Sequence, residues 1–489
     1  MNRRMVFYML GRIIILQAVL MVLPLICGLI YMEKSAFSFV ITIAIALVIG
    51  LVMSVLNKPK NKTIFAREGF VIVALVWIFM SAIGALPFVI SGEISSFTDA
   101  FFETVSGFTT TGASIAGNIE GMSHCILFWR SFTHWIGGMG VLVLVMAIVP
   151  SDTDRSMHIM RAEVPGPIVG KLVPKIRTTA KILYLIYIVM TLIEVVLLLC
   201  GGMPLFESLV HSFGTAGTGG FGVKSDSIAG YSPYSQWVIT VFMVLFGVNF
   251  NLYYLLLMRK FRSVVKSEEI WVYFAIIAVS VTAIAFNIYP LYNNISETVR
   301  TSAFQVASII STTGYATADF NLWPTLSKGI LLLLMFIGAC AGSTAGGLKV
   351  SRVILLFKQI VLNLKNMLHS RSVAAIRLEG KRIEKGTVIN VTTYFALYSL
   401  CYAFIFLLLS FADNFDLETN ISAAAACFNN IGPGFSKVGP VSSYAAYSAI
   451  SKWGLSIAML MGRLEILPMI LLFAPSSWIK AKSVKKGKI

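Results

Sequence analysis

The residues with the clearest potential for chemistry lie in four short stretches that each place small or polar residues before a glycine. The four stretches are residues 109–113 (TTTGA), 217–221 (GTGGF), 311–315 (STTGY) and 429–433 (NNIGP). Rings of backbone carbonyl oxygens can replace the hydration shell of a monovalent cation, and glycine permits the backbone angles that turn those carbonyls inward. Four copies in one chain therefore predict four walls around one axis, with a cation as the ligand.

A short, fairly apolar segment precedes each of these glycines and starts near an acidic residue. The acidic residues are Asp99 and Glu103, Glu207, Glu297 and Glu418. Segments of about 10–14 residues are too short to span a bilayer and are more often re-entrant or buried. We therefore predict re-entrant helices whose C-terminal ends, which carry partial negative charge, favour cations.

Composition identifies the chain as a membrane protein. It has 489 residues, of which 57% are hydrophobic and only 12% are charged, with a net charge of +17. Soluble domains carry about 25% charged residues. Most Lys and Arg residues fall in segments that would share one side of the membrane, which the positive-inside rule makes the cytoplasm. We expect both termini on that side, and no nucleic acid as a partner.

The hydropathy pattern predicts an all-α polytopic fold with an N-terminal two-helix hairpin and four helix–pore loop–helix repeats in pseudo-fourfold arrangement around one pore. We expect the hairpin helices near 8–32 and 36–57. Ten crossings are expected in all, with second helices of the repeats near 124–150, 234–258, 326–358 and 450–475. The predicted units are residues 1–65 (hairpin), 66–152, 153–265, 266–385 and 386–489 (repeats 1 to 4, the last with a basic tail).

Other motifs exclude common functions. Residues 217–222 match the pattern GxGxxG, but they lie between membrane segments and not in a strand–turn–helix unit, so a dinucleotide site is rejected. The five histidines show no metal-ligand spacing, and the six cysteines sit singly in or beside apolar runs. No catalytic constellation stands out, and we predict no enzymatic activity.

Two features inside apolar segments are unusual. A run of small residues interrupts the second helix of repeat 3, and it consists of Gly338, Ala339, Cys340, Ala341, Gly342, Ser343, Thr344, Ala345, Gly346 and Gly347. Its interpretation is either close helix–helix packing or a broken helix whose loop crosses the ion path. Arg463, with Glu465 nearby, is either a functional charge inside the membrane or part of a structural ion pair at the helix end.

The combination of motifs resembles the Trk/Ktr/HKT superfamily of potassium transporters, and the N-terminal hairpin is similar to its TrkH branch. The resemblance covers nearly the whole chain and includes WIGGMG (135–140), AEVPGP (162–167), NNIGPG (429–434) and residues 338–349. It implies a bacterial cytoplasmic membrane protein that forms a homodimer on a cytosolic TrkA-like nucleotide-binding ring. NAD(H) or ATP would bind to that ring, and this chain would hold no cofactor besides K⁺.

The resemblance also implies roles for residues. K⁺ would bind in a selectivity filter, residues 338–347 would form an intramembrane gating loop, and Arg463 would be a barrier in the pore. The implied filter residues are Thr110, Thr111, Gly112, Thr218, Gly219, Gly220, Thr312, Thr313, Gly314, Asn430, Ile431 and Gly432.

Two further function classes remain open beside a channel-like pore for K⁺ uptake. A secondary transporter coupled to Na⁺ or H⁺ would place its substrate between inverted repeats, whereas these repeats all begin on the basic side. A receptor or scaffold without transport would not explain four re-entrant glycine loops. Flux measurements with and without a Na⁺ or H⁺ gradient separate the three.

Overall fold

The computed structural model describes residues 1–59, 66–140, 176–369 and 375–478, and within these ranges the chain is almost entirely helical. The N-terminal hairpin consists of α1 (Arg3–Leu20), α2 (Val22–Ile30) and α3 (Ala36–Leu56). Helices α1 and α2 follow one another across a break at Met21, and α1 packs along α3. The hairpin was predicted as an element outside the repeats, and its two arms lie where the hydropathy placed them.

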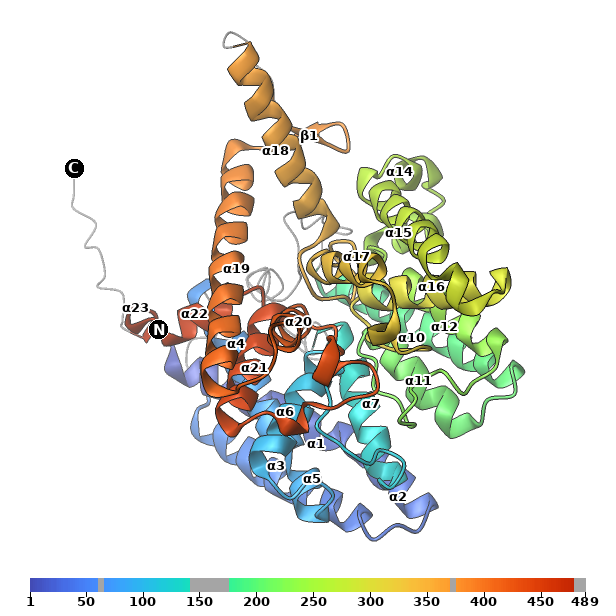
Figure 1. Cartoon of the computed structure of the whole chain (residues 1–489). Coiled ribbons are helices and arrows are strands. Elements are labelled where there is room, and N and C mark those ends of the chain that lie inside the picture. Colours follow the sequence, from blue (N-terminus) through green and yellow to red (C-terminus); the bar gives the residue numbers. More distant parts are fainter. Residues whose placement is uncertain (60–65, 141–175, 370–374, 479–489) are drawn as a thin grey trace, which may run out of the picture.

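Four repeats follow, each with a long helix, a short helix, a glycine loop and a second helix (Figure 1). Repeat 1 has α4 (Ala66–Gly84), α5 (Leu86–Ser91), α6 (Phe97–Phe108) and α7 (His124–Gly138), and repeat 2 has α10 (Ile176–Cys200), α11 (Leu205–Gly217), α12 (Pro233–Phe246) and α13 (Phe250–Leu257). After α14 (Phe261–Val265), repeat 3 has α15 (Glu268–Tyr292), α16 (Ile295–Ile310), η2 (Phe320–Leu322), α17 (Thr325–Phe336) and α18 (Val350–Leu368). A hairpin of β1 (Arg377–Leu378) and β2 (Lys381–Arg382) leads to repeat 4, with α19 (Lys385–Ala412), α20 (Leu417–Phe428), η3 (Ser436–Val438), η4 (Tyr444–Ala446), α21 (Ala449–Arg463), α22 (Leu467–Phe473) and α23 (Pro475–Trp478).

The short helices α6, α11, α16 and α20 form where the sequence predicted them. Side chains of Ser96, Asn294 and Asp416 cap the first turns of α6, α16 and α20 by accepting backbone N–H bonds. Such caps satisfy N–H groups that have no partner within the helix. Each short helix also carries an acidic residue in its first turn, where the helix dipole stabilises it.

The second helix of every repeat is shorter than predicted. Helices α7, α12, α17 and α21 contain 15, 14, 12 and 15 residues. The continuous helix expected over 234–258 is wrong, because α12 and α13 meet at an angle of 91°. The helix expected over 450–475 is also wrong, because Glu465 and Ile466 adopt positive φ and separate α21 from α22. In repeat 1, α7 ends at Gly138, and residues 141–150 of the expected helix lie outside the described ranges.

The described residues contain six helices that are long and apolar enough to cross a membrane, or seven if the bent pair is one span. Ten continuous crossings were expected, and the difference comes from the interrupted second helices. Non-helical backbone at membrane depth is tolerated only inside protein or beside a water-filled cavity. The interruptions therefore mark the interior of the molecule, where bonds from residues 338–347 and Arg463 satisfy backbone groups at the breaks.

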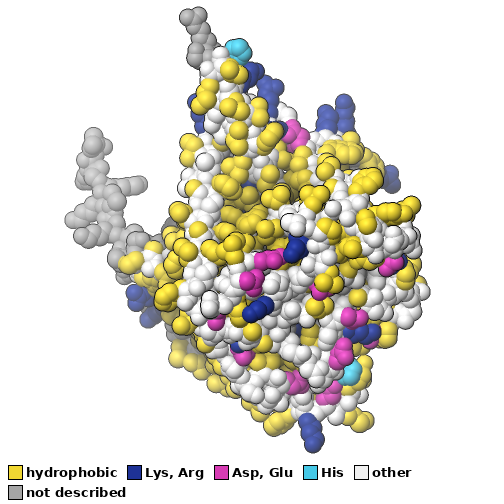
Figure 2. Space-filling model, in the orientation of Figure 1, with side chains coloured by type: hydrophobic (Ala, Val, Ile, Leu, Met, Phe, Trp, Pro, Cys, Tyr) yellow, Lys and Arg dark blue, Asp and Glu magenta, His cyan; other side chains and the backbone are white. Residues whose placement is uncertain are grey.

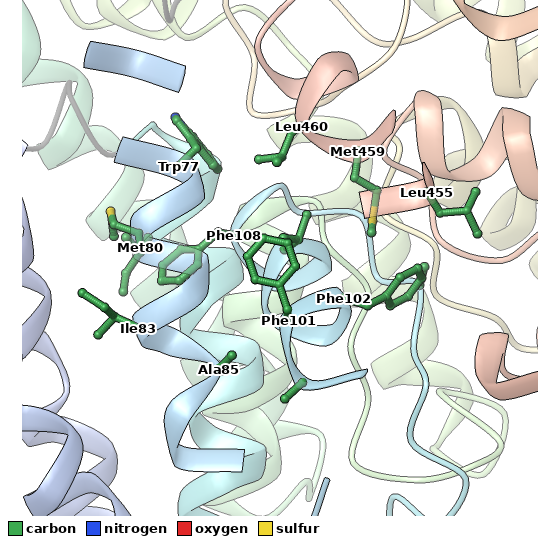
Figure 3. Packing of buried hydrophobic residues seen from close by; sticks show 14 of the residues in the cluster. Trp77, Met80, Ile83, Ala85, Phe101, Phe102, Phe108, Leu455, Met459 and Leu460 are labelled. Carbon is green, nitrogen blue, oxygen red and sulfur yellow. The ribbon is translucent and has the colours of Figure 1, made fainter. Parts of the chain in front are cut away.

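Apolar side chains fix the short helices in place. Figure 3 shows Trp77 and Met80 of α4, Phe102 and Phe108 of α6, and Met459 of α21 packed in one cluster. These side chains are all buried, and removing one large core side chain typically costs about 3–5 kcal/mol. The cluster holds the first short helix between the long helix of its own repeat and the second helix of repeat 4.

Helix α18 projects from the body of the molecule (Figure 1). One side of it exposes large apolar residues, and Figure 2 shows hydrophobic side chains along this projection. The exposed apolar residues are Phe357, Ile360, Val361, Leu364, Met367 and Leu368. A contiguous apolar face of this kind marks a surface covered by lipid or by another protein.

Candidate functional site

The four glycine loops, residues 110–112, 218–220, 312–314 and 430–432, share one backbone conformation. The first residue of each has positive φ: 54° at Thr110, 56° at Thr218, 57° at Thr312 and 56° at Asn430. The third residue is the glycine, with φ of 77°, 77°, 88° and 101° at Gly112, Gly220, Gly314 and Gly432. Positive φ at a β-branched residue such as threonine is a genuine outlier. Its recurrence at equivalent positions shows that the loops are copies of one structure.

The same hydrogen bond anchors each loop to its short helix. The amide of the middle residue, Thr111, Gly219, Thr313 or Ile431, donates to the carbonyl five residues earlier, and all four bonds measure 2.8 Å. The last turn of each short helix thus closes onto its loop. The C-terminal end of each short helix, with its partial negative charge, therefore lies directly at the loop.

The glycines and the neighbouring carbonyls form a closed ring. A Cβ atom added to Gly112 would overlap the carbonyl oxygen of Gly219, and one added to Gly220 would overlap that of Thr313. Likewise a Cβ on Gly314 would meet the Ile431 oxygen, and one on Gly432 would meet the Thr111 oxygen. The order runs from loop 1 through loops 2, 3 and 4 and back to loop 1. All twelve predicted residues are brought together at this ring.

The ring is narrow and well supported. The carbonyl oxygen of Thr313, in the loop opposite the first, would lie only 3.6 Å from a Cβ on Gly112. Asn430 donates from Nδ2 to Oγ1 of Thr111 at 3.0 Å, which ties loop 4 to loop 1. The side-chain oxygens Oγ1 of Thr110 and Oδ1 of Asn430 are buried and have no hydrogen-bond partner among the residues that the structure describes. Buried oxygens usually have partners, so these two are free to accept from water or to contact a cation.

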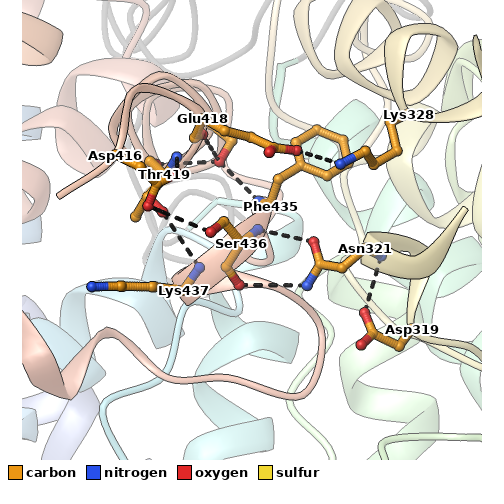
Figure 4. Close-up of polar contacts among 10 residues, drawn as sticks. Asp319, Asn321, Lys328, Asp416, Glu418, Thr419, Phe435, Ser436 and Lys437 are labelled. Atoms are coloured by element: carbon orange, nitrogen blue, oxygen red, sulfur yellow. Dashed lines mark hydrogen bonds and ion pairs between the residues drawn. The ribbon is translucent and has the colours of Figure 1, made fainter. Parts of the chain in front are cut away.

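A polar network joins η2 and the start of α17 in repeat 3 to the start of α20 and to η3 in repeat 4 (Figure 4). Asn321 accepts a 2.9 Å bond from the Ser436 amide, which links the segments after loops 3 and 4. Lys328 and Glu418 form a 2.6 Å ion pair. Hydrogen bonds from the Thr419 side chain and then its amide lower the pKa of Asp416 below its usual value, so its carboxylate stays charged at the end of α20.

Residues 338–347 form a loop that is closed at its base. The Gly338 amide donates to the Leu348 carbonyl at 2.7 Å, and the Val350 amide donates to the Ala339 carbonyl at 3.2 Å. These residues are therefore not part of a packed continuous helix, because α17 ends at Phe336 and α18 begins at Val350. Of the two interpretations of the small-residue run, the structure has the broken helix.

The 338–347 loop touches the glycine loops and the breaks in other helices. The Gly346 amide donates to Oγ1 of Thr312 at 2.7 Å. The Cys340 amide donates to the Gly247 carbonyl at 3.0 Å, and the Phe250 amide donates to the Gly342 carbonyl at 3.0 Å. The loop thus satisfies backbone groups at the α12–α13 break while it lies directly beside the ring.

Arg463 at the end of α21 contacts the 338–347 loop. Its guanidinium donates to the Thr344 carbonyl of the 338–347 loop at 2.6 Å and to the carbonyls of Gly137 and Gly138 at 2.5 and 2.7 Å. A pocket next to the ring is lined by Arg463, Lys349, Gly346 and Gly138, among others. Glu465, two positions along the chain, forms a 2.6 Å ion pair with Arg352. The arginine therefore joins α7, α21 and the loop.

Sequence reasoning missed several residues at the site. Glu269, buried at the start of α15, accepts from the amides of Ala341 and Ser351 at 2.7 and 3.0 Å and so ties the 338–347 loop to the first turn of α18. The Lys349 ammonium donates to the carbonyls of Ala345 and Gly346. Glu269 lies at the start of a predicted helix and Lys349 lies within the helix predicted over 326–358, and neither was assigned a role from the sequence. His134 packs on Gly219, which explains why loop 2 has glycine at its middle position.

The ligand set points to an alkali cation. The described residues hold no group of three or more His, Cys, Asp or Glu side chains that could bind a metal ion. The ring instead offers backbone carbonyls and hydroxyls, which suit weakly bound monovalent ions that must enter and leave. The sequence argued against a dinucleotide site at residues 217–222, because such a site follows a strand. In the structure these residues begin at the last residue of helix α11. Residues 162–167 lie outside the described ranges.

Comparison with known proteins agrees with this geometry. The family model TrkH, described as a cation transport protein, matches residues 35–482. The Trk system potassium uptake protein TrkH of Salmonella typhimurium is 35% identical over 98% of this chain and 100% of its own length. TrkG of Escherichia coli is 34% identical over 97% of this chain and 98% of its own length. The crystal structure of the potassium transporter TrkH from Vibrio parahaemolyticus matches with a TM-score of 0.88 and 32% identity, covering 98% of this chain and 100% of that one.

These matches extend over nearly the full chain and agree with its apolar helices. The expected resemblance, the helical membrane fold and the absence of an enzymatic role are confirmed. The chain is a multi-pass membrane protein that belongs to the TrkH family of cation transport proteins.

Proposed function

We propose that this chain takes up K⁺ through a channel-like pore, as the membrane subunit of a multi-component potassium uptake system. The ring of glycine loops carries the proposal, supported by the relatives whose names are Trk system potassium uptake proteins. Residues 110–112, 218–220, 312–314 and 430–432 are the filter. Their carbonyl oxygens replace the hydration shell of K⁺, and the negative ends of four short helices add to the attraction.

The repeated backbone outliers favour a functional ring over simple packing. Three threonines and one asparagine hold positive φ directly before the ring carbonyls. Such conformations cost about 1–3 kcal/mol each and persist where the surrounding structure and function require them. A ring that served only to pack four helices would have no need of four identical strained turns.

The 338–347 loop is the gate in this proposal, and Arg463 is a barrier beside it. The loop contacts the proposed filter residue Thr312 directly, and Arg463 donates a hydrogen bond to the Thr344 carbonyl of the loop. A cation that leaves the filter on this side meets a fixed positive charge. Opening therefore requires the loop and the guanidinium to move, and the contacts at Gly137, Gly138 and Glu269 set how firmly they are held.

The proposed assembly is a homodimer on a cytosolic TrkA-like nucleotide-binding ring in the bacterial cytoplasmic membrane. Support comes from the exposed apolar face of α18 and from the basic segments that the positive-inside rule assigns to the cytoplasm with both termini. Nucleotide, as NAD(H) or ATP, would act on the ring, and this chain would bind only K⁺. The four repeats, with the predicted boundaries, would be the pore units.

Growth of bacteria at low K⁺ tests the proposal. A host strain without its own K⁺ uptake systems, but with its Trk regulatory subunit, should grow at micromolar K⁺ when it expresses this chain. Expression of the chain at normal level in the membrane without rescue of growth would count against K⁺ uptake as its function.

A further inference from the structure

We propose that a buried ion pair between Glu103 and Arg130 sets the selectivity of the pore by fixing the separation of the segments that follow the first and second glycine loops. The pair makes Arg130 and Glu103 positioning residues, which act on the ring through its backbone. This inference rests on the proposed function of the glycine loops as a filter.

The pair is deeply buried and fully bonded. Arg130 of α7 is 2% exposed and Glu103 of α6 is 1% exposed. The Nε and Nη2 atoms of Arg130 both lie 2.8 Å from Oε1 of Glu103. Buried charges are costly unless they are paired and hydrogen-bonded, so a pair of this kind behind the ring calls for a role beyond packing.

Both partners extend to the segment after loop 1. The Ile115 amide donates to Oε2 of Glu103 at 2.8 Å, and the Ser114 hydroxyl donates to Oε1 of Glu103 at 3.0 Å. Nη2 of Arg130 donates to the Ser114 hydroxyl at 3.1 Å. Ser114 lies two residues after the ring glycine Gly112. The ion pair therefore holds the backbone immediately beyond the first loop.

Arg130 also reaches the segment after loop 2. Its Nη1 atom donates to the carbonyl of Gly222 at 3.3 Å, and its guanidinium carbon lies 4.1 Å from the centre of the Phe221 ring. Gly222 is two residues after the ring glycine Gly220, the position that corresponds to Ser114. One guanidinium thus bridges equivalent positions of two neighbouring loops, whose glycine and carbonyl meet in the ring.

In the described residues, the contacts named below between the segments that directly follow the other loops are uncharged, and the ion pairs Lys328–Glu418 and Asp99–Lys452 join helices of neighbouring repeats. The Tyr315 hydroxyl donates to the Phe221 carbonyl at 3.4 Å between loops 3 and 2. Asn321 and Ser436 join the segments after loops 3 and 4, and the Tyr444 amide donates to the Ser114 carbonyl at 2.9 Å between loops 4 and 1. Between loops 1 and 2 the other contact is an exposed one, from the Ser225 amide to Glu120.

The ion pair acts by fixing the positions of the two segments and not by an electrostatic effect on the passing ion. The two charges are adjacent, so the pair presents little net charge to a passing ion. A lysine at position 130 keeps that neutrality, but it lacks the planar fork that bonds Glu103, Ser114 and Gly222 together. Arg130→Lys therefore separates the geometry of the pair from its charge, and Ser114→Ala weakens the same bridge without touching either charge.

The experiment measures Rb⁺ uptake by the full-length purified chain in liposomes. The readout is the ratio of the Na⁺ and K⁺ concentrations that halve uptake, measured for the wild type, Arg130→Lys, Ser114→Ala and a control, Asp99→Asn. Asp99 lies on the same helix as Glu103 and forms a 2.7 Å ion pair with Lys452, but that pair joins α6 to α21. The control thus breaks an ion pair of α6 that does not bridge the loops.

We expect Arg130→Lys to lower the ratio by roughly tenfold, the change that accompanies the loss of about one charge-assisted hydrogen bond. Ser114→Ala should lower it by roughly threefold, since a neutral bond contributes less, while Asp99→Asn leaves it at the wild-type value. Folded Arg130→Lys and Ser114→Ala proteins with the wild-type ratio would overturn the proposal. If Arg130→Lys does not fold, an unchanged ratio in Ser114→Ala overturns it alone. A wild type with no preference for K⁺ would instead contradict the proposed filter.

Discussion

Thr110, Thr218, Thr312 and Asn430 hold the left-handed backbone conformation that glycine usually supplies. The cost of this conformation for an L-residue is roughly 1–2 kcal/mol. Because of this conformation, the carbonyls of the residues that follow can all face the centre of the ring. In the proposed filter, selectivity would depend on backbone angles that neighbouring contacts enforce, such as the bond from the Gly346 amide to Oγ1 of Thr312.

The ring glycine of loop 3 gives the sharpest single-residue prediction. Gly314→Ala should place a Cβ against the Ile431 carbonyl at a φ of 88° and displace that oxygen. We expect the preference for K⁺ over Na⁺ to fall by at least about tenfold, since a strain of roughly 1–2 kcal/mol acts on the ring itself. Gly432→Ser should act in the same way on the Thr111 carbonyl. Competition by Na⁺ against Rb⁺ uptake measures both.

Gly329→Ala is the matched control for Gly314→Ala. Gly329 lies on α17 in the same repeat, and a Cβ there would meet no other atom within 4 Å. This variant should keep wild-type selectivity. Wild-type selectivity in Gly314→Ala and Gly432→Ser as well would remove the glycine loops from the filter.

Arg463 allows a prediction about flux rather than selectivity. A cation at about 4 Å from its charge would feel roughly 4 kcal/mol of repulsion at an effective dielectric constant of 20. Its bond to the Thr344 carbonyl also holds the 338–347 loop closed. Arg463→Gln should therefore raise the rate of Rb⁺ uptake several-fold and leave the ratio of K⁺ to Na⁺ unchanged. A folded variant with slower uptake would show that the arginine mainly supports the α7 carbonyls.

Among the helices, the main feature of the structure is that the second helix of each repeat ends early. The second helices stop after 12–15 residues, and the groups freed at the breaks bond to the 338–347 loop or to Arg463. Because each freed carbonyl or amide at membrane depth needs a partner, the loop and the breaks depend on each other. Movement of the loop must therefore be coupled to the ends of α7 and α12.

Glu269 tests this coupling. Its carboxylate accepts from the Ala341 amide in the 338–347 loop and from the Ser351 amide in the first turn of α18. Glu269→Gln keeps the shape but weakens both bonds, so the loop should open more often and basal Rb⁺ uptake should rise. Glu268→Gln is the control, because Glu268 pairs with Lys358 on α18 and does not contact the loop. Equal uptake in the two variants would argue against the loop as a gate.

The sequence predicts the repeats well and the breaks poorly. Runs of apolar residues predict helix positions, because the length and hydrophobicity of a run are local properties of the sequence. The four glycine motifs mark the loops. The break after Gly247 is not visible in this way, since the run continues through apolar residues on both sides. Asn249 caps α13 by accepting from the Asn251 amide. The 338–347 loop supplies further partners at the break, through the bonds between Cys340 and Gly247 and between Phe250 and Gly342.

The candidate site also has some features that the sequence predicts and others that it does not. Glycine at the third position of each loop can be read from sequence, because its φ is one that other residues avoid. The positive φ at Thr110, Thr218 and Thr312 cannot, since threonine is a poor residue for it. Arg463 was identified as an unusual charge, but its partners come from α7 and repeat 3, more than a hundred residues away along the chain.

At the scale of the whole molecule, the pore region and the projecting α18 are connected through a few contacts. Lys358 on α18 pairs with Glu268 at the start of α15, directly beside Glu269, which holds the 338–347 loop. Ser267 donates to Glu379 of the β-hairpin next to α18. In the proposed assembly, a cytosolic partner bound to the exposed face of α18 acts on the loop through this pair, so Glu268→Gln changes the response to the partner and leaves basal uptake unchanged.

We propose that K⁺ moves down its own gradient through the ring of glycine loops. Rb⁺ uptake tests this in liposomes that contain the purified wild-type chain and are loaded with K⁺, without any Na⁺ or H⁺ gradient. We expect Rb⁺ to accumulate as K⁺ leaves, external Na⁺ to compete weakly, and Gly314→Ala to remove this preference. Uptake that appears only when a Na⁺ or H⁺ gradient is imposed would contradict it and indicate a coupled transporter.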